Sequence, residues 1–155
     1  MCIRDRTYMY KRPKFILSHE AVFPISFHDT DAMGVVWHGN YIKFFELARE
    51  AFLEEIKYGY QDMKDEGLAY PITECTCKYR KYLRVTDKVL RVVTLLCEYE
   101  GKVVFHYEVY PKDSNTLCAY GKTEQVCIKA STGELIFETP RSLLNAIKKY
   151  ESEQR

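Results

Sequence analysis

The sequence FHDTDAMGVVWHGNYIKFFELARE, residues 27–50, is the stretch that decides the fold. It begins with a polar, glycine-containing turn over residues 28–39 and then continues directly into a block with helical periodicity. In and just after that block, apolar side chains recur every three or four residues with charged side chains between them: Tyr41, Phe44, Phe45, Ala48, Phe52 and Ile56. This spacing predicts a helix that begins near Asn40 and buries one aromatic face.

The start of this helix has the properties of a site for developing negative charge. The first four N–H groups of a helix lack partners within it, and the helix dipole places its positive end there. Asn40 is a favourable N-cap residue, and Gly39 before it lets another group approach these donors closely. A carboxylate in the preceding turn, Asp31 above all, would lie within reach of a carbonyl group that the helix end polarises. We therefore predict a site that can attack and hold an acyl group.

Length and composition indicate a single domain. The chain has 155 residues, of which 46% are hydrophobic, and its net charge of +1 argues against a nucleic-acid face or a polybasic membrane patch. No apolar run reaches the roughly 18 residues of a membrane helix, and no export signal is visible. We expect one domain over residues 7–155. Residues 1–6, MCIRDR, have the character of translated vector or adapter sequence, not of native protein.

The six cysteines do not form a recognisable metal or disulfide pattern. There is no C-x-x-C element, and no histidine stands at a zinc-like spacing from a cysteine. Five of the six fall in strand-like segments, where a reduced thiol behaves as a small hydrophobe. We therefore expect no metal and a reducing, cytoplasmic compartment.

The pattern of the rest of the chain predicts strands and a few helices. Residues 15–27 predict a first strand in which Pro24 favours an edge position. The long helix should stop near Gly59, and a shorter helix is expected over residues 61–66. Four long strands are expected over residues 72–83, 88–100, 102–111 and 116–130, and a final helix is expected over residues 140–150. Because short turns join these strands, antiparallel pairing is predicted, which gives an α+β fold in which a sheet wraps the aromatic helix.

One set of residues gives the pattern D-x-D-x-x-G-x-V-x-H-x-N-Y followed by E-x-x-R: Asp29, Asp31, Gly34, Val36, His38, Asn40, Tyr41, Glu46 and Arg49. The pattern resembles the hotdog-fold acyl-CoA thioesterases, in the subgroup of 4-hydroxybenzoyl-CoA thioesterase and the YbgC-type bacterial enzymes. This resemblance implies a hotdog fold, a long central helix wrapped by a curved antiparallel sheet. It also implies hydrolysis of an acyl-CoA to free acid and CoA, in a homodimer or homotetramer with the active site at a subunit interface.

The resemblance also suggests roles for individual residues. Asp31 matches the family's catalytic acid, as nucleophile or general base. The N–H of His38 would polarise the thioester carbonyl together with those of Gly39 and Asn40, while the His38 side chain could equally orient substrate or be structural. The expected substrate-binding residues of this segment are Gly34, Val36, Trp37, Gly39 and Tyr41. Aromatic residues at helical spacing are also common in cores, so Trp37 and Tyr41 have that second interpretation.

Two sets of charged residues have alternative interpretations. Glu46 and Arg49, three residues apart, most simply pair at a surface or interface, although another hotdog branch uses a helix glutamate as its catalytic group. A basic stretch could hold the CoA phosphates or could line a solvated strand edge: Lys78, Arg80, Lys81 and Arg84.

The sequence leaves the acyl group and one functional alternative open. Trp37 resembles the aromatic-acyl branch of the family, whereas His38 resembles the aliphatic branch. No phosphate-binding loop or dinucleotide fingerprint is present, and we expect no cofactor, since CoA is part of the substrate. The alternative is a noncatalytic hotdog module that binds acyl-CoA or acyl-carrier protein.

Overall fold

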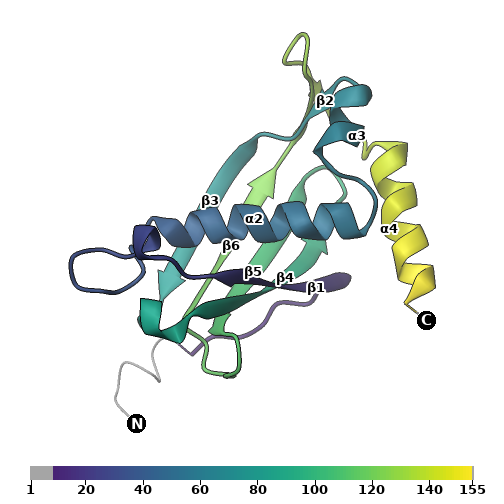
Figure 1. The fold of residues 1–155 in the computed structure, drawn as a ribbon. Coiled ribbons are helices and arrows are strands. Elements are labelled where there is room, and N and C mark those ends of the chain that lie inside the picture. The colour runs from purple at the N-terminus through teal and green to yellow at the C-terminus, as the bar shows by residue number, and fades with distance from the viewer. Residues whose placement is uncertain (1–8, 155) are drawn as a thin grey trace.

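A five-stranded antiparallel sheet curves around the helix α2 (Asn40–Glu55) in the computed structural model, which describes residues 9–154 (Figure 1). The strands, in their order across the sheet, are β1 (Leu17–Pro24), β4 (Val89–Glu98), β5 (Val103–Pro111), β6 (Ala119–Gln125) and β3 (Ile72–Tyr79). Every neighbouring pair is antiparallel. The predicted arrangement of a long helix wrapped by a curved antiparallel sheet is therefore confirmed. The adapter-like residues 1–6 lie outside the described residues.

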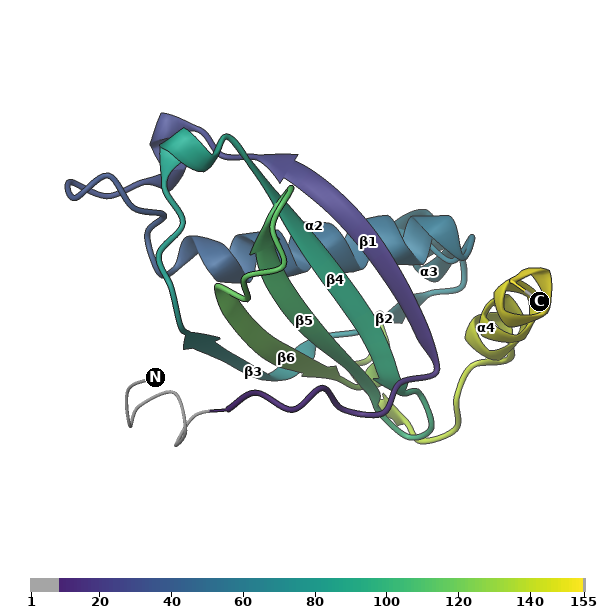
Figure 2. The same cartoon turned by 90° about the horizontal axis from the view of Figure 1, so that it is seen from below.

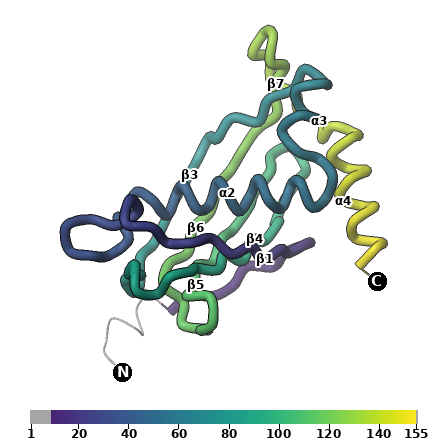
Figure 3. The backbone as a smooth tube through the Cα atoms, in the orientation of Figure 1, coloured from purple at the N-terminus to yellow at the C-terminus, as the bar shows by residue number. Residues whose placement is uncertain are grey.

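Smaller elements cover one end of this sheet. A three-stranded sheet has the order β2-β7-β8, and the helices α3 and α4 lie near it (Figure 3). Their bounds are α3 (Tyr60–Asp65), β2 (Leu68–Ala69), β7 (Cys127–Lys129), β8 (Leu135–Ile136) and α4 (Arg141–Glu153), and two 3-10 turns are η1 (Phe27–Asp29) and η2 (Val85–Asp87). Within residues 9–154, no helix is both long and apolar enough to cross a membrane.

Stacked aromatic rings hold α2 against the inner face of the sheet. Phe45 lies parallel to Tyr107 with ring centroids 4.5 Å apart, and Phe52 meets Phe105 edge to face at 5.6 Å. All four side chains are almost completely buried, so each contributes on the order of 2 kcal/mol through its apolar area. Gly121 makes this approach possible, because a Cβ atom there would lie 2.7 Å from Cε2 of Phe45.

Several predicted elements have different ends in the structure, and the strand predicted over residues 72–83 already ends at Tyr79. The helix α2 stops at Glu55, not near Gly59, because Lys57 adopts a positive φ of 63° and turns the chain. Gly59 instead precedes α3, where its N–H donates to Asp62. The strand predicted over residues 116–130 is divided into β6 and β7. Pro24 is the last residue of β1, an outer strand of the sheet, as its lack of an N–H donor favours.

A segment before β1, residues 9–16, crosses the outer face of the sheet, and we call it the strap (Figure 2). The Tyr10 hydroxyl donates to the carboxylate of Glu108 at 2.6 Å, and Nε of Arg12 donates to it at 2.8 Å. Glu108 follows Tyr107 on β5 and therefore points to the opposite face from the ring that stacks on α2. Its side chain is fully buried beneath the strap, and the same strap supplies Arg12, the cation that offsets this burial.

Candidate active site

The turn that leads into α2 is held together by Asp31. Its N–H donates to the carbonyl of Val35 at 2.9 Å, and its Oδ1 accepts from the N–H of Met33 at 2.8 Å. Gly34 closes the turn with a φ of 78°, a conformation that favours glycine. Within residues 9–154, Oδ2 of Asp31 accepts no hydrogen bond. One carboxylate oxygen therefore fixes the turn, and the other is available at an exposed position.

Asp29 connects the same turn to the helix and has a structural role. Its buried carboxylate pairs with Lys43 of α2 and accepts from the N–H of Ser26 at 2.9 Å. Its carbonyl accepts from the Trp37 N–H and from Nδ2 of Asn40, both at 2.8 Å. Although burial by itself raises the pKa of Asp29, the hydrogen bonds from Lys43 and Ser26 outweigh it and lower this pKa below the ordinary value. These contacts make Asp29 the acceptor that caps the 3-10 turn η1 at Ser26.

Two backbone donors remain free at the start of α2. Among the described residues, the N–H groups of His38 and Gly39 donate to no protein acceptor. The N–H of Asn40 is already used, since it donates to the Trp37 carbonyl at 2.9 Å. Gly39, not Asn40, occupies the N-cap position, and Asn40 is the first helical residue. The expected cap at Asn40 is corrected: its side chain holds Asp29, and the free donors lie one and two residues earlier.

Asp31 and His38, whose N–H is one of the two free donors, border one open pocket of about 390 Å³, and Gly39 follows His38 outside its lining. The lining residues that bear on the chemistry are Asp31, His38, Tyr41, Tyr79, Arg80 and Lys81. The pocket combines a carboxylate with free helix-end donors and two basic side chains, which together suit a substrate with an electrophilic carbonyl and an anionic portion.

Tyr79 of β3 is a contributor that the sequence interpretation missed. Its hydroxyl donates to the carbonyl of His38 at 2.8 Å, and its ring packs edge to face against Tyr41 with centroids 5.2 Å apart. This contact ties the start of α2 to the edge of the sheet. The sequence places Tyr79 between basic residues and does not indicate that it contacts the helix start, because strand alternation does not say which face meets the helix.

The other residues predicted to bind substrate have different positions. Val36 lines the pocket but is also part of the core, as is Tyr41, whose burial raises its pKa to about 12. Trp37 is half exposed beside Gly39, and neither lines the pocket directly. Gly34 contributes through its turn conformation.

The charged residues divide into groups that the sequence did not separate. Lys78 lies within β3 on the outer face, opposite to Tyr79, and does not reach the Asp31 pocket. Arg80 and Lys81 follow the end of the strand, where the alternation no longer applies, and both line the pocket. Arg84, like Lys78, lies outside the pocket lining. Within one chain, Lys78 and Arg84 therefore do not join Arg80 and Lys81 in the lining of this pocket.

The predicted pair on α2 is present. Arg49 lies 3.6 Å from Glu46 and also donates to the Tyr107 hydroxyl at 3.3 Å. Both residues border a more apolar pocket of about 430 Å³, together with Tyr60 and Met63. Glu46 therefore does not share the pocket of Asp31, so the two carboxylates do not act at one centre within a single chain.

Comparison with known proteins gives the class to which this fold and site belong. The family described as the thioesterase-like superfamily matches residues 25–147. The acyl-CoA thioester hydrolase YbgC of Escherichia coli O6:H1 is 28% identical over 104 residues, which cover 67% of this chain and 77% of that protein.

Solved structures agree. The DHNA-CoA thioesterase from Staphylococcus aureus has a TM-score of 0.76 and 27% identity, covering 88% of this chain and 93% of that one. A hypothetical protein, TT1821 from Thermus thermophilus, has a TM-score of 0.75 and 27% identity, covering 86% of this chain and 97% of that one. The chain belongs to the thioesterase-like superfamily. The predicted hotdog fold and the predicted class of enzyme, a thioester hydrolase, are confirmed.

Proposed function

We propose that the protein hydrolyses acyl-CoA thioesters at the start of α2, with Asp31 as the reactive carboxylate. The observation that carries the proposal is the pocket that Asp31, with one unengaged carboxylate oxygen, shares with His38, whose free N–H is followed by that of Gly39. Similarity to YbgC, which is named as an acyl-CoA thioester hydrolase, supports the substrate class. The DHNA-CoA thioesterase similarity keeps aromatic acyl groups among the candidates.

The chemistry follows from this arrangement. The thioester carbonyl accepts hydrogen bonds from the two free donors, which stabilise the oxyanion that develops during attack. Oδ2 of Asp31 then either attacks the carbonyl carbon to form an anhydride, which water hydrolyses, or removes a proton from the attacking water. In either case the carbon–sulfur bond breaks and CoA leaves as its thiolate, which takes up a proton. The proposed reaction uses no metal and no bound cofactor.

The anionic part of CoA has two candidate partners at the same pocket. Arg80 and Lys81 follow β3 and line the pocket beside Tyr79, and no carboxylate is paired with either within residues 9–154. A guanidinium can hold a phosphate through two parallel hydrogen bonds, and an ammonium acts as a point charge. We assign Arg80 and Lys81 to the CoA phosphates.

Self-association of two chains through β3 is part of the proposal. β3 is an outer strand of the sheet, and each of its residues except Cys77 is exposed. Such an edge presents unpaired backbone groups that a second strand can bind. Sedimentation at equilibrium should give a mass of at least twice 18.3 kDa, and a purely monomeric species would contradict this assignment.

A cytoplasmic location is also part of the proposal. The cysteines that the structure describes are all free thiols: Cys75, Cys77, Cys97, Cys118 and Cys127. Free thiols of this number fit a reducing compartment.

The central test compares the wild type with Asp31→Asn. Asparagine retains an oxygen that can accept the Met33 N–H, so the turn is kept while the carboxylate is lost. Release of CoA from a panel of aromatic and aliphatic acyl-CoAs should fall by at least about 100-fold, in the range of other catalytic carboxylates. CoA is best measured by chromatography, because Cys75 is an exposed thiol that would react with a chromogenic disulfide.

The matched control is Asp113→Asn, an exposed aspartate between β5 and β6. It should turn over the panel like the wild type. Equal turnover by Asp31→Asn and the wild type would remove Asp31 from its role. If the wild type binds acyl-CoA but releases no CoA, the noncatalytic binding module is favoured. In that case the role of Asp31 is only to hold its turn.

A further inference from the structure

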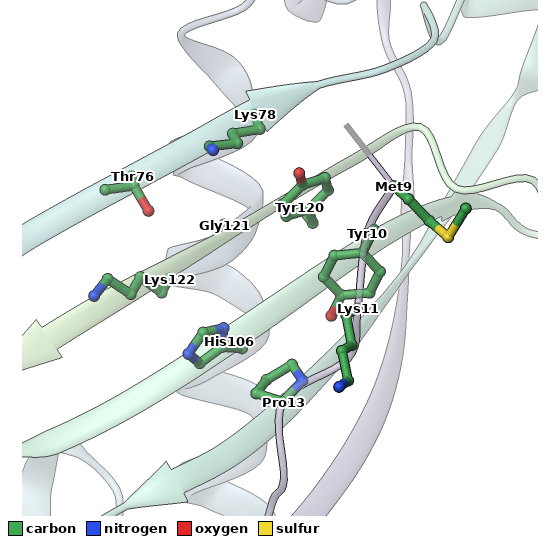
Figure 4. A pocket seen from close by; sticks show the side chains of 10 residues that line it. All are labelled: Met9, Tyr10, Lys11, Pro13, Thr76, Lys78, His106, Tyr120, Gly121 and Lys122. Atoms are coloured by element: carbon green, nitrogen blue, oxygen red, sulfur yellow. The ribbon is translucent and has the colours of Figure 1, made fainter. Parts of the chain in front are cut away.

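A second pocket, of about 220 Å³, lies on the outer face of the sheet under the strap. Its walls come from four segments: Lys11 and Pro13 of the strap, Lys78 of β3, His106 of β5, and Tyr120 and Lys122 of β6. Figure 4 shows the amines of Lys78 and Lys122 on neighbouring strands, with the Thr76 hydroxyl near both and the His106 ring beside Lys122. This pocket and the Asp31 pocket are on opposite faces of the sheet.

The basic groups around this pocket are only partly neutralised. Lys122 pairs with Glu74 at 3.2 Å and lies 3.9 Å from Glu124. Lys11 and Lys78 have no ion pair with any residue from 9 to 154. The pocket therefore gathers more ammonium groups than its carboxylates balance, which gives it a local positive potential despite the near-neutral chain.

The strap fixes the position of this charge. Lys11 stands between Tyr10 and Arg12, which both donate to the buried Glu108. The Tyr10 ring also packs against the Tyr120 ring, with centroids 4.4 Å apart. Because both neighbours of Lys11 are anchored, its backbone is held at the pocket rim and less entropy is lost when a ligand binds.

We propose that this outer pocket binds the phosphate group of a small molecule, held by Lys11, Lys78 and Lys122 with help from Thr76 and His106. A phosphate group offers several acceptor oxygens, and lysine ammonium groups and hydroxyls are donors that match it. The ring nitrogens of His106 make no side-chain hydrogen bond within the described chain, so an imidazole donor is also available. The ligand is either free phosphate or a phosphate monoester.

His106 provides a direct readout of binding. Its burial, and then the nearby Lys122, lower the pKa of His106 below its usual value, while Glu108 and Glu124 act in the opposite direction. Lys11 and Lys78 are the other charged groups that border the pocket. A bound phosphate adds negative charge next to the imidazole, so it should raise this pKa.

The test uses the full chain labelled with ¹⁵N-histidine, in which His106→Gln identifies one of four histidine signals. Inorganic phosphate and adenosine 5′-monophosphate are titrated separately against sodium chloride of equal ionic strength. The His106 signal should shift saturably with at least one phosphate probe while His28 stays in place. Tighter binding of the nucleotide would indicate a phosphate monoester as the ligand, and equal binding would indicate free phosphate.

Substitutions test whether phosphate binds in this outer pocket. Lys11→Gln and Lys78→Gln should each weaken binding about tenfold, the effect of losing one charge-assisted hydrogen bond. The matched control, Lys148→Gln on the exposed side of α4, should bind like the wild type. A shift that follows ionic strength alone, or unchanged affinity in both pocket variants, would overturn the proposal. None of these readouts depends on thioester hydrolysis, so the result is separate from that of the Asp31 site.

Discussion

The indole ring of Trp37 lies directly against Gly39 at the start of α2. A Cβ atom at residue 39 would be 2.8 Å from Cε3 of the ring and closer still to two other ring carbons. Gly39 is not in the left-handed region, since its φ is −66°, so the requirement for glycine is one of space and not of backbone conformation. The ring and any side chain at residue 39 would therefore compete for the same small volume.

Gly39→Ala is predicted to lower kcat/KM by at least about tenfold, because the methyl group must displace the indole or tilt the donor, and a lost oxyanion donor costs more than that. Trp37→Ala should relieve the clash, so Gly39→Ala should cost less in that background. Steady-state kinetics of the two single variants and the double variant measure this coupling. Additive losses would contradict the competition.

Removing the two cations that we assign to the CoA phosphates should affect substrate binding and not chemistry. Arg80→Gln and Lys81→Gln should each raise KM for an acyl-CoA about three- to tenfold, with kcat nearly unchanged, because each loses a phosphate contact. A thioester of pantetheine, which lacks the nucleotide, should show no such change. Lys112→Gln, at an exposed position after β5, is the control. Equal effects on the acyl-CoA and on the pantetheine thioester would show that Arg80 and Lys81 do not act through the CoA phosphates.

The strap should contribute to stability through Glu108. Arg12→Ala leaves a buried carboxylate without its cation and should lower the free energy of unfolding by about 1–3 kcal/mol, reduced from the fully buried case by the partial exposure of Arg12. Adding Glu108→Gln should restore part of this loss, since a neutral amide needs no cation. Urea unfolding of the three variants tests it. Strictly additive changes would show that the two groups are not coupled.

Acid should destabilise the fold through two carboxylates. Burial alone raises the pKa of Asp29 and of Glu108, but hydrogen bonds from Lys43 and Ser26 to Asp29, and from Arg12 and Tyr10 to Glu108, lower both. A carboxyl group whose folded pKa is depressed stabilises the fold above its unfolded pKa of about 4, and this contribution is lost as the pH falls through the folded pKa.

The free energy of unfolding should therefore fall steadily below about pH 4–5. Lys43→Met should flatten this dependence by removing one of the cations. Urea unfolding at a series of pH values measures it. A wild-type stability that does not change between neutral and acid pH would be inconsistent with paired carboxylates at these positions.

Gly121→Ala tests the packing of the aromatic core. The added methyl group would meet the Phe45 ring and the Thr76 carbonyl, so overpacking should cost about 1–3 kcal/mol. Phe45→Leu should make the same substitution at residue 121 less costly, because the smaller side chain leaves room. Thermal unfolding monitored by circular dichroism provides the comparison. Equal costs in both backgrounds would mean that the backbone carbonyl, not the ring, sets the limit.

Periodicity was sufficient to predict the order of the main elements. The aromatic repeat after Asn40 predicted α2, and the short turns between apolar runs predicted antiparallel strands. Element ends were less certain, since they depend on local backbone choices such as the positive φ of Lys57. The two-residue strands β2 and β8 have too few residues for any repeat to appear.

The site was predictable where the chemistry lies within one segment. Asp31, His38 and Gly39 are close in sequence, and the start of α2 explains why they lie near one another. Contacts between segments were not accessible in this way: Tyr79 reaches His38 from β3, and Lys78 faces away from Arg80. The first depends on which side of β3 meets the helix and the second on where β3 ends. Both are properties of the tertiary fold that the sequence of β3 alone does not contain.

Trp37 is the single tryptophan of the chain, and 48% of it is exposed next to the two free amide donors. Its fluorescence therefore comes from one place in the molecule, beside the pocket where the acyl group is expected. Ligand arrival can be followed through emission intensity without any added dye. Because the ring is already half in water in the native protein, the same signal will report poorly on global unfolding.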